Sequence, residues 1–434
     1  MTSNFAQPDT KTQQGIEGVD YTAPGKLVLA NFDIDSVLAE STEISLWELS
    51  NYLAVEWWLI KYKPRQNDTN LEQVRGYIEG FHHLCEVEEW EKASQLFTAH
   101  LNNTNEELHC QLNIWGYYHE SLEICQRLLS KLNTKLNTVI LNTLGNSYNE
   151  LCNYTQAIDC YQQILEISGS IKDCHLKGVI SVNLGCIYHD IGDYNKAIKY
   201  IMGGLNIAQE IEDIEGESCA LANLGNVYEA LAEHDMAIDC YHKALKIVIE
   251  ISDKRAESNI LVNLGNAYFS VENYELAINY LHQGLVIAQK SQERAAESHA
   301  LGNLGNVYDA LEDYNRAIDC YEKSLVISRE IGSRSSESET LCNLGITLMY
   351  VGQHSNAMKH FQESLEVCRE IDNYYTAAFV YKNLAEISYE SERNDLAHTF
   401  CNQALLIATK LGIPLAKECE ELKKKCVRKS TIKM

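Results

Sequence analysis

The sequence predicts an all-α protein built as a solenoid of tandem two-helix repeats. This prediction rests on a six-residue segment that returns every 40 residues, and on alanines and leucines that return in the same register. Solenoids of this kind have repeats of about 20 to 50 residues. Each unit packs only on its neighbours, so the core lengthens with the chain. The absence of proline between Pro64 and Pro414 agrees with a long succession of uninterrupted helices.

The six-residue segment marks the first helix, helix A, of each repeat. It reads Asn-Leu-Gly-Cys-Ile-Tyr from Asn183 to Tyr188. The spacing is 40 residues without insertion or deletion, so seven units follow one another. Close copies begin at Asn223, Asn263 and Asn303, and weaker copies begin at Thr143, Asn343 and Asn383.

A second helix, helix B, is predicted in each unit by small residues followed eight positions later by leucine. The segments around both sets have apolar residues at three- and four-residue intervals, as in amphipathic helices. A glycine costs about 1 kcal/mol inside a helix relative to alanine, so we expect Gly225 and its equivalents where helix B of the same unit approaches closely. The alanines are Ala157, Ala197, Ala237, Ala277, Ala317, Ala357 and Ala397, and the leucines are Leu165, Leu205, Leu245, Leu285, Leu325, Leu365 and Leu405.

The pattern Leu224-Gly225-x-x-Tyr228 in helix A, followed by Ala237-x-x-x-Tyr241 in helix B, resembles the tetratricopeptide repeat family. The match spans residues 135–412, although the unit is 40 residues instead of about 34 and lacks the usual terminal proline. The longer unit is similar to the LGN/Pins class of polarity scaffolds and to long bacterial arrays. The resemblance implies a right-handed superhelix whose A helices line a concave surface that binds peptides.

The remaining segments are expected to flank this array. Residues 1–25 contain few large apolar groups and are expected to be disordered. Residues 26–134 are expected to be helical, with two degenerate repeats, and 413–434 to form a capping helix with a basic tail. Two interpretations stay open for the tryptophan-rich segment Ile44–Tyr62, which either caps the array or binds a partner. The basic tail is either a solvated helix end or an anionic docking site.

Asparagines on the A helices are the candidate peptide-binding residues. Asparagine is a mediocre helix former, so its recurrence needs a reason. Its amide offers a donor and an acceptor, which matches a peptide group. The alternative is that these amides bond across neighbouring A helices and serve structure alone. The candidates are Asn183, Asn223, Asn263, Asn303 and Asn343 in one column, with Asn226, Asn266 and Asn306 three residues further on.

Carboxylates one turn after the asparagines indicate the charge of the ligand. Glu229 and Asp309 are expected to face the same surface, where an acidic rim favours a partner that contains lysine or arginine. The alternative is an ordinary acidic surface. The variant of the family that captures an acidic C-terminus needs cations on the A helices, and the sequence places Val182, Ala222 and Val262 there instead.

Composition limits the classes of partner. The formal net charge is −25 and the isoelectric point is about 5.0, and such a surface repels phosphate backbones. We find neither a secretory signal nor an apolar stretch long enough to cross a bilayer. The 15 cysteines include no Cys-x-x-Cys pair, as expected for reduced thiols. We therefore expect a cytoplasmic protein with no nucleic-acid partner, membrane insertion, metal or cofactor.

The sequence contains no catalytic motif that we can identify. It has no phosphate-binding loop and no Gly-x-Ser-x-Gly elbow. Cys160, Cys240 and Cys320 occupy one position of alternate repeats, which indicates packing. We therefore predict a scaffold or adaptor that binds a protein or peptide and is not an enzyme. One alternative is a peptide-gated regulator of a separate effector, as resemblance to Rap-like sensors implies, and another is an enzyme subunit.

Overall fold

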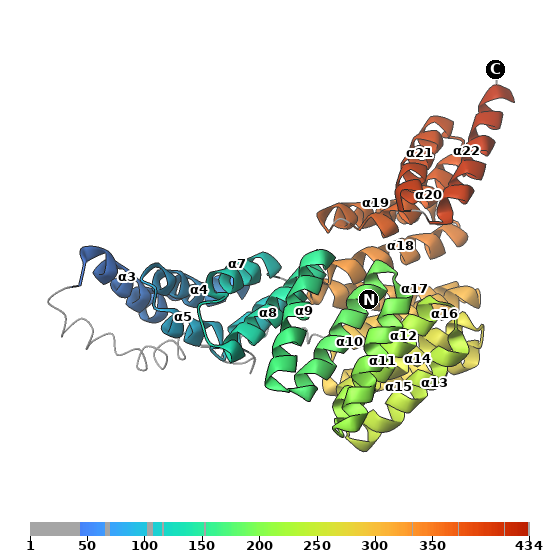
Figure 1. Cartoon of the computed structure of the whole chain (residues 1–434). Helices are drawn as coiled ribbons and strands as arrows, with labels where there is room; N and C mark the ends of the chain where they lie inside the picture. The colour runs from blue at the N-terminus through green and yellow to red at the C-terminus, as the bar shows by residue number, and fades with distance from the viewer. Residues whose placement is uncertain are drawn as a thin grey trace. The chain divides into compact units, whose positions relative to one another are not determined.

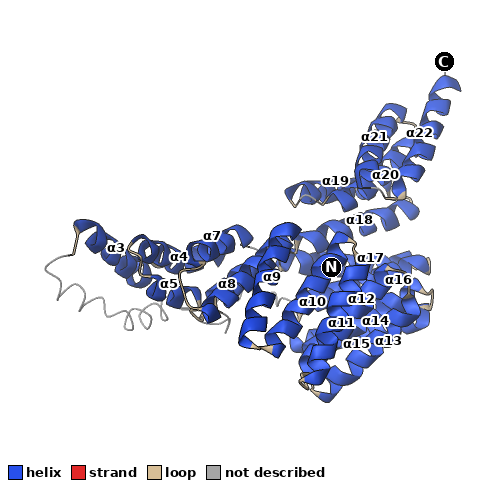
Figure 2. Ribbon diagram, in the orientation of Figure 1, coloured by secondary structure: helices blue, strands red, loops and turns tan. Residues whose placement is uncertain are grey.

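The structure is a computed structural model that describes residues 44–65, 70–101, 107–114, 117–151, 153–331, 333–371, 373–411 and 413–432. Residues 1–25, predicted to be disordered, lie outside the described residues, as do the side chains of the basic tail after Lys425. The all-α prediction is confirmed, because the described chain is helical and contains no strand (Figure 2). A single isolated bridge joins His100 to Glu107.

The helices fall into two compact units, residues 1–227 and 228–434, whose boundary lies inside α12 (Figure 1). The first unit contains α3 (Leu46–Glu56), the π-helix η1 (Trp57–Lys61), α4 (Asn70–Glu86), α5 (Trp90–Phe97), α6 (Leu108–Ile114), α7 (Tyr118–Leu128), α8 (Thr134–Glu150), α9 (Tyr154–Ile171), α10 (Cys174–Ile191), α11 (Tyr194–Glu210) and most of α12 (Ile214–Ala230). The second contains α13 (His234–Glu250), α14 (Lys254–Ser270), α15 (Tyr274–Ser291), α16 (Arg294–Ala310), α17 (Tyr314–Glu330), α18 (Arg334–Tyr350), α19 (His354–Glu370), α20 (Tyr374–Glu390), α21 (Asn394–Leu411) and α22 (Leu415–Ile432).

From α8 to α21 the helices alternate as A and B helices with the predicted 40-residue period. The even-numbered helices α8 to α20 are the A helices and the odd-numbered α9 to α21 are the B helices. Several A helices begin at a capping side chain, as at Asp173, whose carboxylate accepts from the Leu176 N–H at 2.9 Å. Such a cap is worth about 1 kcal/mol, because it satisfies a backbone donor left open by the helix start. The caps recur at Asn133, Asp173, Asp213, Asp253 and Asn373.

The glycines of the A helices lie where helix B of the same repeat approaches, as predicted. A Cβ at Gly265 would lie 2.5 Å from Cγ of Leu281, and a Cβ at Gly305 would lie 2.5 Å from the ring of Tyr321. Neither position can accept a side chain without moving helix B. The alanines expected on helix B are fully buried in every repeat, so both helices have small residues where they cross.

The N-terminal helices pack into one apolar core with the first repeats. Val55 and Leu59 are buried beside α4, whereas Trp47 and Trp57 are about half exposed. The tryptophan-rich segment therefore has a buried side and an exposed apolar side. At the other end, α22 packs on α21, where the Cys401 thiol donates to the carbonyl of Cys419 at 2.9 Å.

None of the described helices has both the length and the apolar composition that crossing a bilayer requires.

The turns between helices reverse the chain at one residue with positive φ. Gly192 and Gly352 occupy this position in two A–B turns, where the left-handed conformation costs glycine little. Ala232 occupies it in another turn with a φ of 58°. An L-residue pays about 1–2 kcal/mol in this conformation. The fold thus tolerates local strain at these turns because the packed helices on both sides fix the chain reversal.

We expect Ala232→Gly to raise the free energy of unfolding by about 0.5–1 kcal/mol, because the relief of the left-handed strain exceeds the entropy cost of glycine. Urea unfolding followed by circular dichroism measures the change. Ala230→Gly, two residues earlier in the last turn of α12, is the matched control and should lower stability by up to about 1 kcal/mol. A loss of stability in both variants would contradict this account.

Candidate functional site

The predicted asparagines lie on successive A helices, and all eight are half-buried. They do not form one uniform set. The amide of Asn223 donates to the carbonyl of Cys219 in its own helix at 3.0 Å. Asn226 and Asn263 also have interaction partners. The differences decide which amides are available to a ligand.

Asn306 is held by two protein donors. The Tyr321 hydroxyl donates to its amide oxygen at 2.7 Å, and the amide of Asn343 donates to the same oxygen at 3.1 Å. The first bond joins helices A and B of one repeat, and the second joins α16 to α18. In the first unit, the Tyr161 hydroxyl donates in the same way to Asn146. These asparagines connect helices, but the tyrosine bonds join helices A and B of one repeat, and only the Asn343 bond runs between neighbouring A helices.

The two predicted carboxylates are also held by neighbouring residues. The hydroxyl of Thr347 on α18 donates to Asp309 on α16 at 2.7 Å. Burial raises the pKa of Asp309, although the Thr347 bond lowers it in part. Glu229 lies 3.1 Å from Nδ1 of His234 at the start of the next helix. Each carboxylate therefore already has a polar contact within the protein.

Three amides differ from these. Within the residues that the structure describes, the side chains of Asn183, Asn266 and Asn303 have no hydrogen-bond partner. The residue that approaches Gly265 from helix B is Leu281, which has no hydroxyl to donate to Asn266. Asn266 on α14 and Asn303 on α16 stand on A helices that pack directly on each other. We call these three amides open, because no described residue bonds to their side-chain donors or acceptors.

A cavity in the first unit is lined in part by Asn183, one of the three open amides. It has a volume of about 260 Å³ and lies between α10, α11 and the start of α12. Sequence reasoning found Asn183 but missed the cavity around it. The lining is His175, Gly178, Val179, Val182, Asn183, Gly204, Ile207, Ala208, Ile211, Asp213, Glu215, Gly216 and Cys219.

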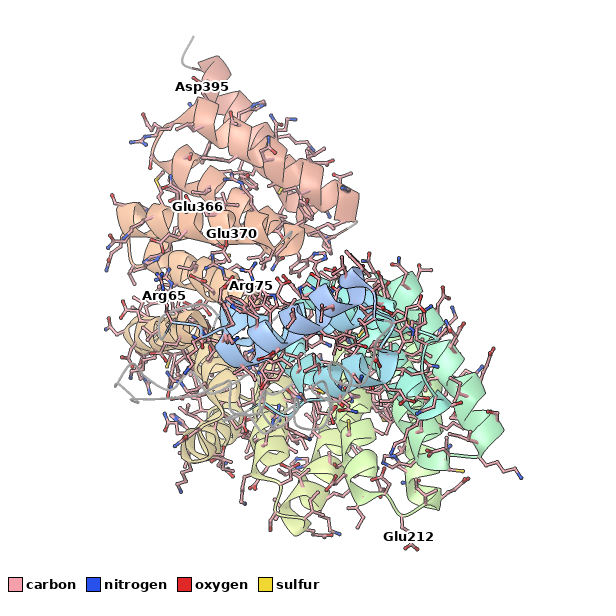
Figure 3. The ribbon with its side chains drawn as sticks, turned by 90° about the vertical axis from the view of Figure 1, so that its left-hand side faces the viewer. Arg65, Arg75, Glu212, Glu366, Glu370 and Asp395 are labelled. Atoms are coloured by element: carbon pink, nitrogen blue, oxygen red, sulfur yellow. The ribbon has the colours of Figure 1, made fainter. Side chains whose placement is uncertain are left out.

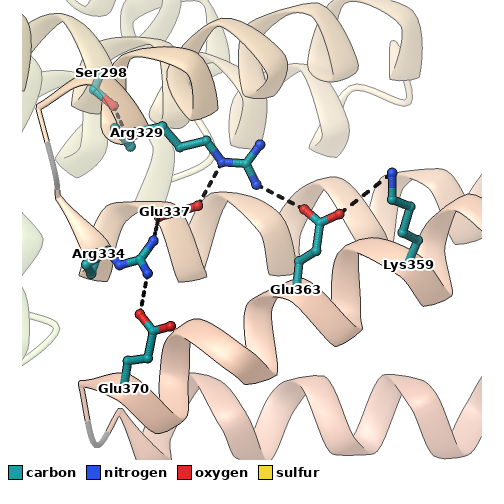
Figure 4. A network of polar contacts seen from close by, with 8 residues as sticks. Ser298, Arg329, Arg334, Glu337, Lys359, Glu363 and Glu370 are labelled. Carbon is teal, nitrogen blue, oxygen red and sulfur yellow. Dashed lines mark hydrogen bonds and ion pairs between the residues drawn. The ribbon is translucent and has the colours of Figure 1, made fainter.

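An ion-pair network in the second unit was also missed from the sequence. Glu337, at the start of α18, is buried and lies 2.7 Å from both Arg329 and Arg334 (Figure 4). Arg329 also contacts Glu363 at 2.9 Å, and Arg334 contacts Glu370, both on α19. Burial alone would raise the pKa of Glu337, but the two arginines hold it below its ordinary value of 4.5. The network ties α17, α18 and α19 together.

The same carboxylate recurs at 40-residue intervals with different partners. Glu297 lies 2.6 Å from Arg294, and Glu257 lies 2.6 Å from Lys254. Glu217 instead accepts from the amide of Gln209 at 2.8 Å. The Glu-Ser pair that recurs every 40 residues is the signal from which these contacts could have been predicted.

Comparison with known proteins bears on the whole array. A family model described as tetratricopeptide repeat matches residues 136–210, 216–290, 256–330 and 336–410, well over half of the chain. No curated protein matches the sequence significantly.

Solved structures of low sequence identity share the fold. A Rap protein complexed with Competence and Sporulation Factor is 16% identical with a TM-score of 0.55, over 79% of this chain and 99% of that one. Aspartyl phosphate phosphatase F from Bacillus subtilis is 13% identical with a TM-score of 0.52, over 93% and 97%. A signal transduction ATPase with a tetratricopeptide repeat sensor from Pyrococcus horikoshii is 18% identical with a TM-score of 0.55, over 91% of this chain and 57% of that one.

We expect Tyr321→Phe to lower the free energy of unfolding by about 0.5–1.5 kcal/mol, because one hydrogen bond to Asn306 is lost while the ring still fills the space over Gly305. The reciprocal change, Phe361→Tyr, places a hydroxyl in the register of Ile346, which offers no side-chain acceptor. It should also destabilise, by about 1–3 kcal/mol. Chemical denaturation measures both, and an unaltered Tyr321→Phe protein would show that the bond does not hold the helices.

We expect Glu337→Gln to cost about 1–3 kcal/mol at neutral pH, because a buried, doubly paired carboxylate is lost. The folded-state pKa of Glu337 is depressed, so its contribution is present above pH 4.5 and disappears as pH falls through the folded-state pKa. The stability difference between wild type and variant should therefore shrink on acidification. Glu366→Gln, an exposed change on α19, is the control and should be near neutral. A difference that does not vary with pH would contradict the assignment.

Proposed function

Because the chain belongs to the tetratricopeptide repeat family, we propose that it is a non-catalytic scaffold or adaptor that binds an extended segment of a partner protein along its A helices. The binding body in this proposal is residues 135–412, with 413–434 covering one end and 26–134 preceding it. The partner is a cytoplasmic protein or peptide, and the strong negative charge favours basic segments over nucleic acid.

The observation that supports the proposal is the open amide pair of Asn266 and Asn303. Asn266 and Asn303 have the same 37-residue separation as Asn306 and Asn343, whose amides are in contact at 3.1 Å. An extended chain rises about 3.3 Å per residue, so the two open amides match neighbouring peptide groups of an extended segment. Each amide can donate to a peptide carbonyl and accept from a peptide N–H.

Asn306 differs from Asn266 and Asn303 in the hydrogen bonds that it already makes within the protein. The oxygen of Asn306 already accepts two hydrogen bonds, so a ligand would have to displace a protein contact. Asn266 and Asn303 have no such contact to lose, since only water competes there. A hydrogen bond gained in this way is worth about 0.5–1.5 kcal/mol, so two asparagines that each make one bond change affinity by about 5- to 150-fold.

A second candidate function is a peptide-gated regulator of a separate effector. The fold that it shares with a Rap protein complexed with Competence and Sporulation Factor supports this candidate. The ligand would then be a short free segment whose binding changes what the rest of the chain contacts. The size of the natural ligand distinguishes the two functions.

The test is selection of random displayed peptides on the full chain, followed by affinity measurement with purified peptides by calorimetry. We expect Asn266→Ala combined with Asn303→Ala to weaken binding about tenfold or more, because both open amides are lost.

The matched control is Asn279→Ala combined with Asn315→Ala. These asparagines are exposed on the B helices α15 and α17, so the same chemical change is made away from the proposed surface. The control should leave affinity unchanged, and circular dichroism should show that both variants are folded. Equal effects of the two pairs, or no selected peptide, would overturn the proposal.

A further inference from the structure

We propose that the cavity between α10, α11 and α12 is a specificity pocket for one lysine or arginine side chain of the bound segment. The proposal deepens the function above and rests on it for the source of the ligand. The lysine or arginine side chain combines a long aliphatic stem with a terminal cation, and the cavity offers a counterpart to each part.

Three glycines meet at the cavity and let its walls approach closely, because a Cβ on Gly204 would lie 2.6 Å from Val182 and a Cβ on Gly216 would lie 2.4 Å from Asp213. Gly178, Gly204 and Gly216 come from α10, α11 and α12 respectively, and all three line the cavity. Side chains occupy most of these positions at the other junctions, for example Thr138, Ile164 and Leu176 one repeat earlier, and Ser298, Ser324 and Ser336 three repeats later. The three glycines are therefore a property of this junction and not of the repeat.

The walls suit an aliphatic stem. Val182 and Ala208 are buried at the cavity, and Val179 and Ile211 are exposed on its surface. A volume of about 260 Å³ is below the usual range of about 300–1,000 Å³ for sites that hold small organic ligands. It has room for a side chain, and the stem of a lysine or arginine buries its methylene groups on such walls.

The charges suit a cation. Asp213 and Glu215 both line the cavity, and the one side chain of its lining that can become cationic, His175, lies 3.4 Å from Asp213. Within the described residues, the carboxylate of Glu215 has no hydrogen-bond or ion-pair partner. The sequence has nine carboxylates and no lysine or arginine between Lys199 and Lys243, so no neighbouring cation in this stretch neutralises them.

One of the three open amides belongs to the lining of the cavity. Asn183 lines it two turns after His175 on α10, which is about 12 Å along the helix axis. His175 is paired with Asp213, so the acidic end and the open amide lie at opposite ends of the cavity along α10. A segment whose backbone meets Asn183 can therefore direct a long side chain toward Asp213 and Glu215.

Alkylation of Cys219 measures occupancy without a known partner. Cys219 lines the cavity and is exposed, whereas Cys174 is exposed outside the lining and serves as an internal control. The full chain is treated with iodoacetamide in the presence of N-acetyl-argininamide or N-acetyl-lysinamide, each at tens of millimolar. Mass spectrometry follows both cysteines. We expect these probes to slow alkylation of Cys219 severalfold and to leave Cys174 unchanged. N-acetyl-norleucinamide, which has the stem without the cation, should protect little.

The charge is tested by Glu215→Gln, with Glu212→Gln as the matched control. Both changes remove one carboxylate close to Asp213, but Glu215 lies in the first turn of α12, whereas Glu212 projects from the tip of its loop and does not line the cavity (Figure 3). Protection of Cys219 should fall in the first variant and persist in the second. Equal protection by the norleucine probe, no protection by either cationic probe, or equal loss in both variants would overturn the pocket.

Peptides connect the pocket to the proposed function. In a selected peptide that contains one essential lysine or arginine, its replacement by norleucine should weaken binding about fivefold to the wild type and less than twofold to the Glu215→Gln protein. Asn266→Ala combined with Asn303→Ala should not change this ratio. Protection of Cys219 without any peptide binding would reject the proposed function and retain the pocket, whereas peptide binding with an unchanged ratio in Glu215→Gln would reject the pocket alone.

Discussion

Close packing of a glycine in helix A against one residue of helix B fixes the geometry of five of the described repeats. The side chain that covers the glycine lies 16 positions later in the chain. The pairs are Gly145 with Tyr161, Gly185 with Ile201, Gly265 with Leu281, Gly305 with Tyr321 and Gly345 with Phe361. Since no side chain separates the two helices there, the rotation of helix A relative to helix B is set, and with it the direction of the residue that follows each glycine.

In the column that follows the glycines, that constraint separates Asn306 from Asn266. The residue after each glycine lies next to the side chain that covers the glycine. Where that side chain is Tyr321, its hydroxyl reaches Asn306, and the amide becomes part of the scaffold. Where it is Leu281, the contact is apolar and Asn266 keeps its donor and acceptor. The residue type at this position of helix B thus distinguishes Asn306, which bonds to Tyr321, from Asn266, which has no hydroxyl opposite it.

Much of the fold was predictable because it repeats. The 40-residue period, the positions of the A and B helices and the close approach at the glycines all follow from residue type at fixed spacing. The columns of asparagines were predictable. Which of these amides bond within the protein was missed, because for Asn306 and Asn266 it depends on whether Tyr321 or Leu281 lies opposite on helix B. The paired Glu337 was missed because its two arginines come from either side of a turn. The cavity beside Asn183 depends on the volume left by three helices together, which no single helix pattern contains.

The central claim is that a bound segment lies against the open amides of the A helices. Site-specific photocrosslinking tests it most directly, with p-benzoyl-phenylalanine incorporated in turn at Asn303 on α16 and at Asn279 on α15, and with a selected peptide as ligand. The account predicts a crosslink from Asn303 and none from Asn279, at peptide concentrations where both proteins bind. Crosslinking from Asn279 alone, or from neither position while the peptide is bound, would contradict it.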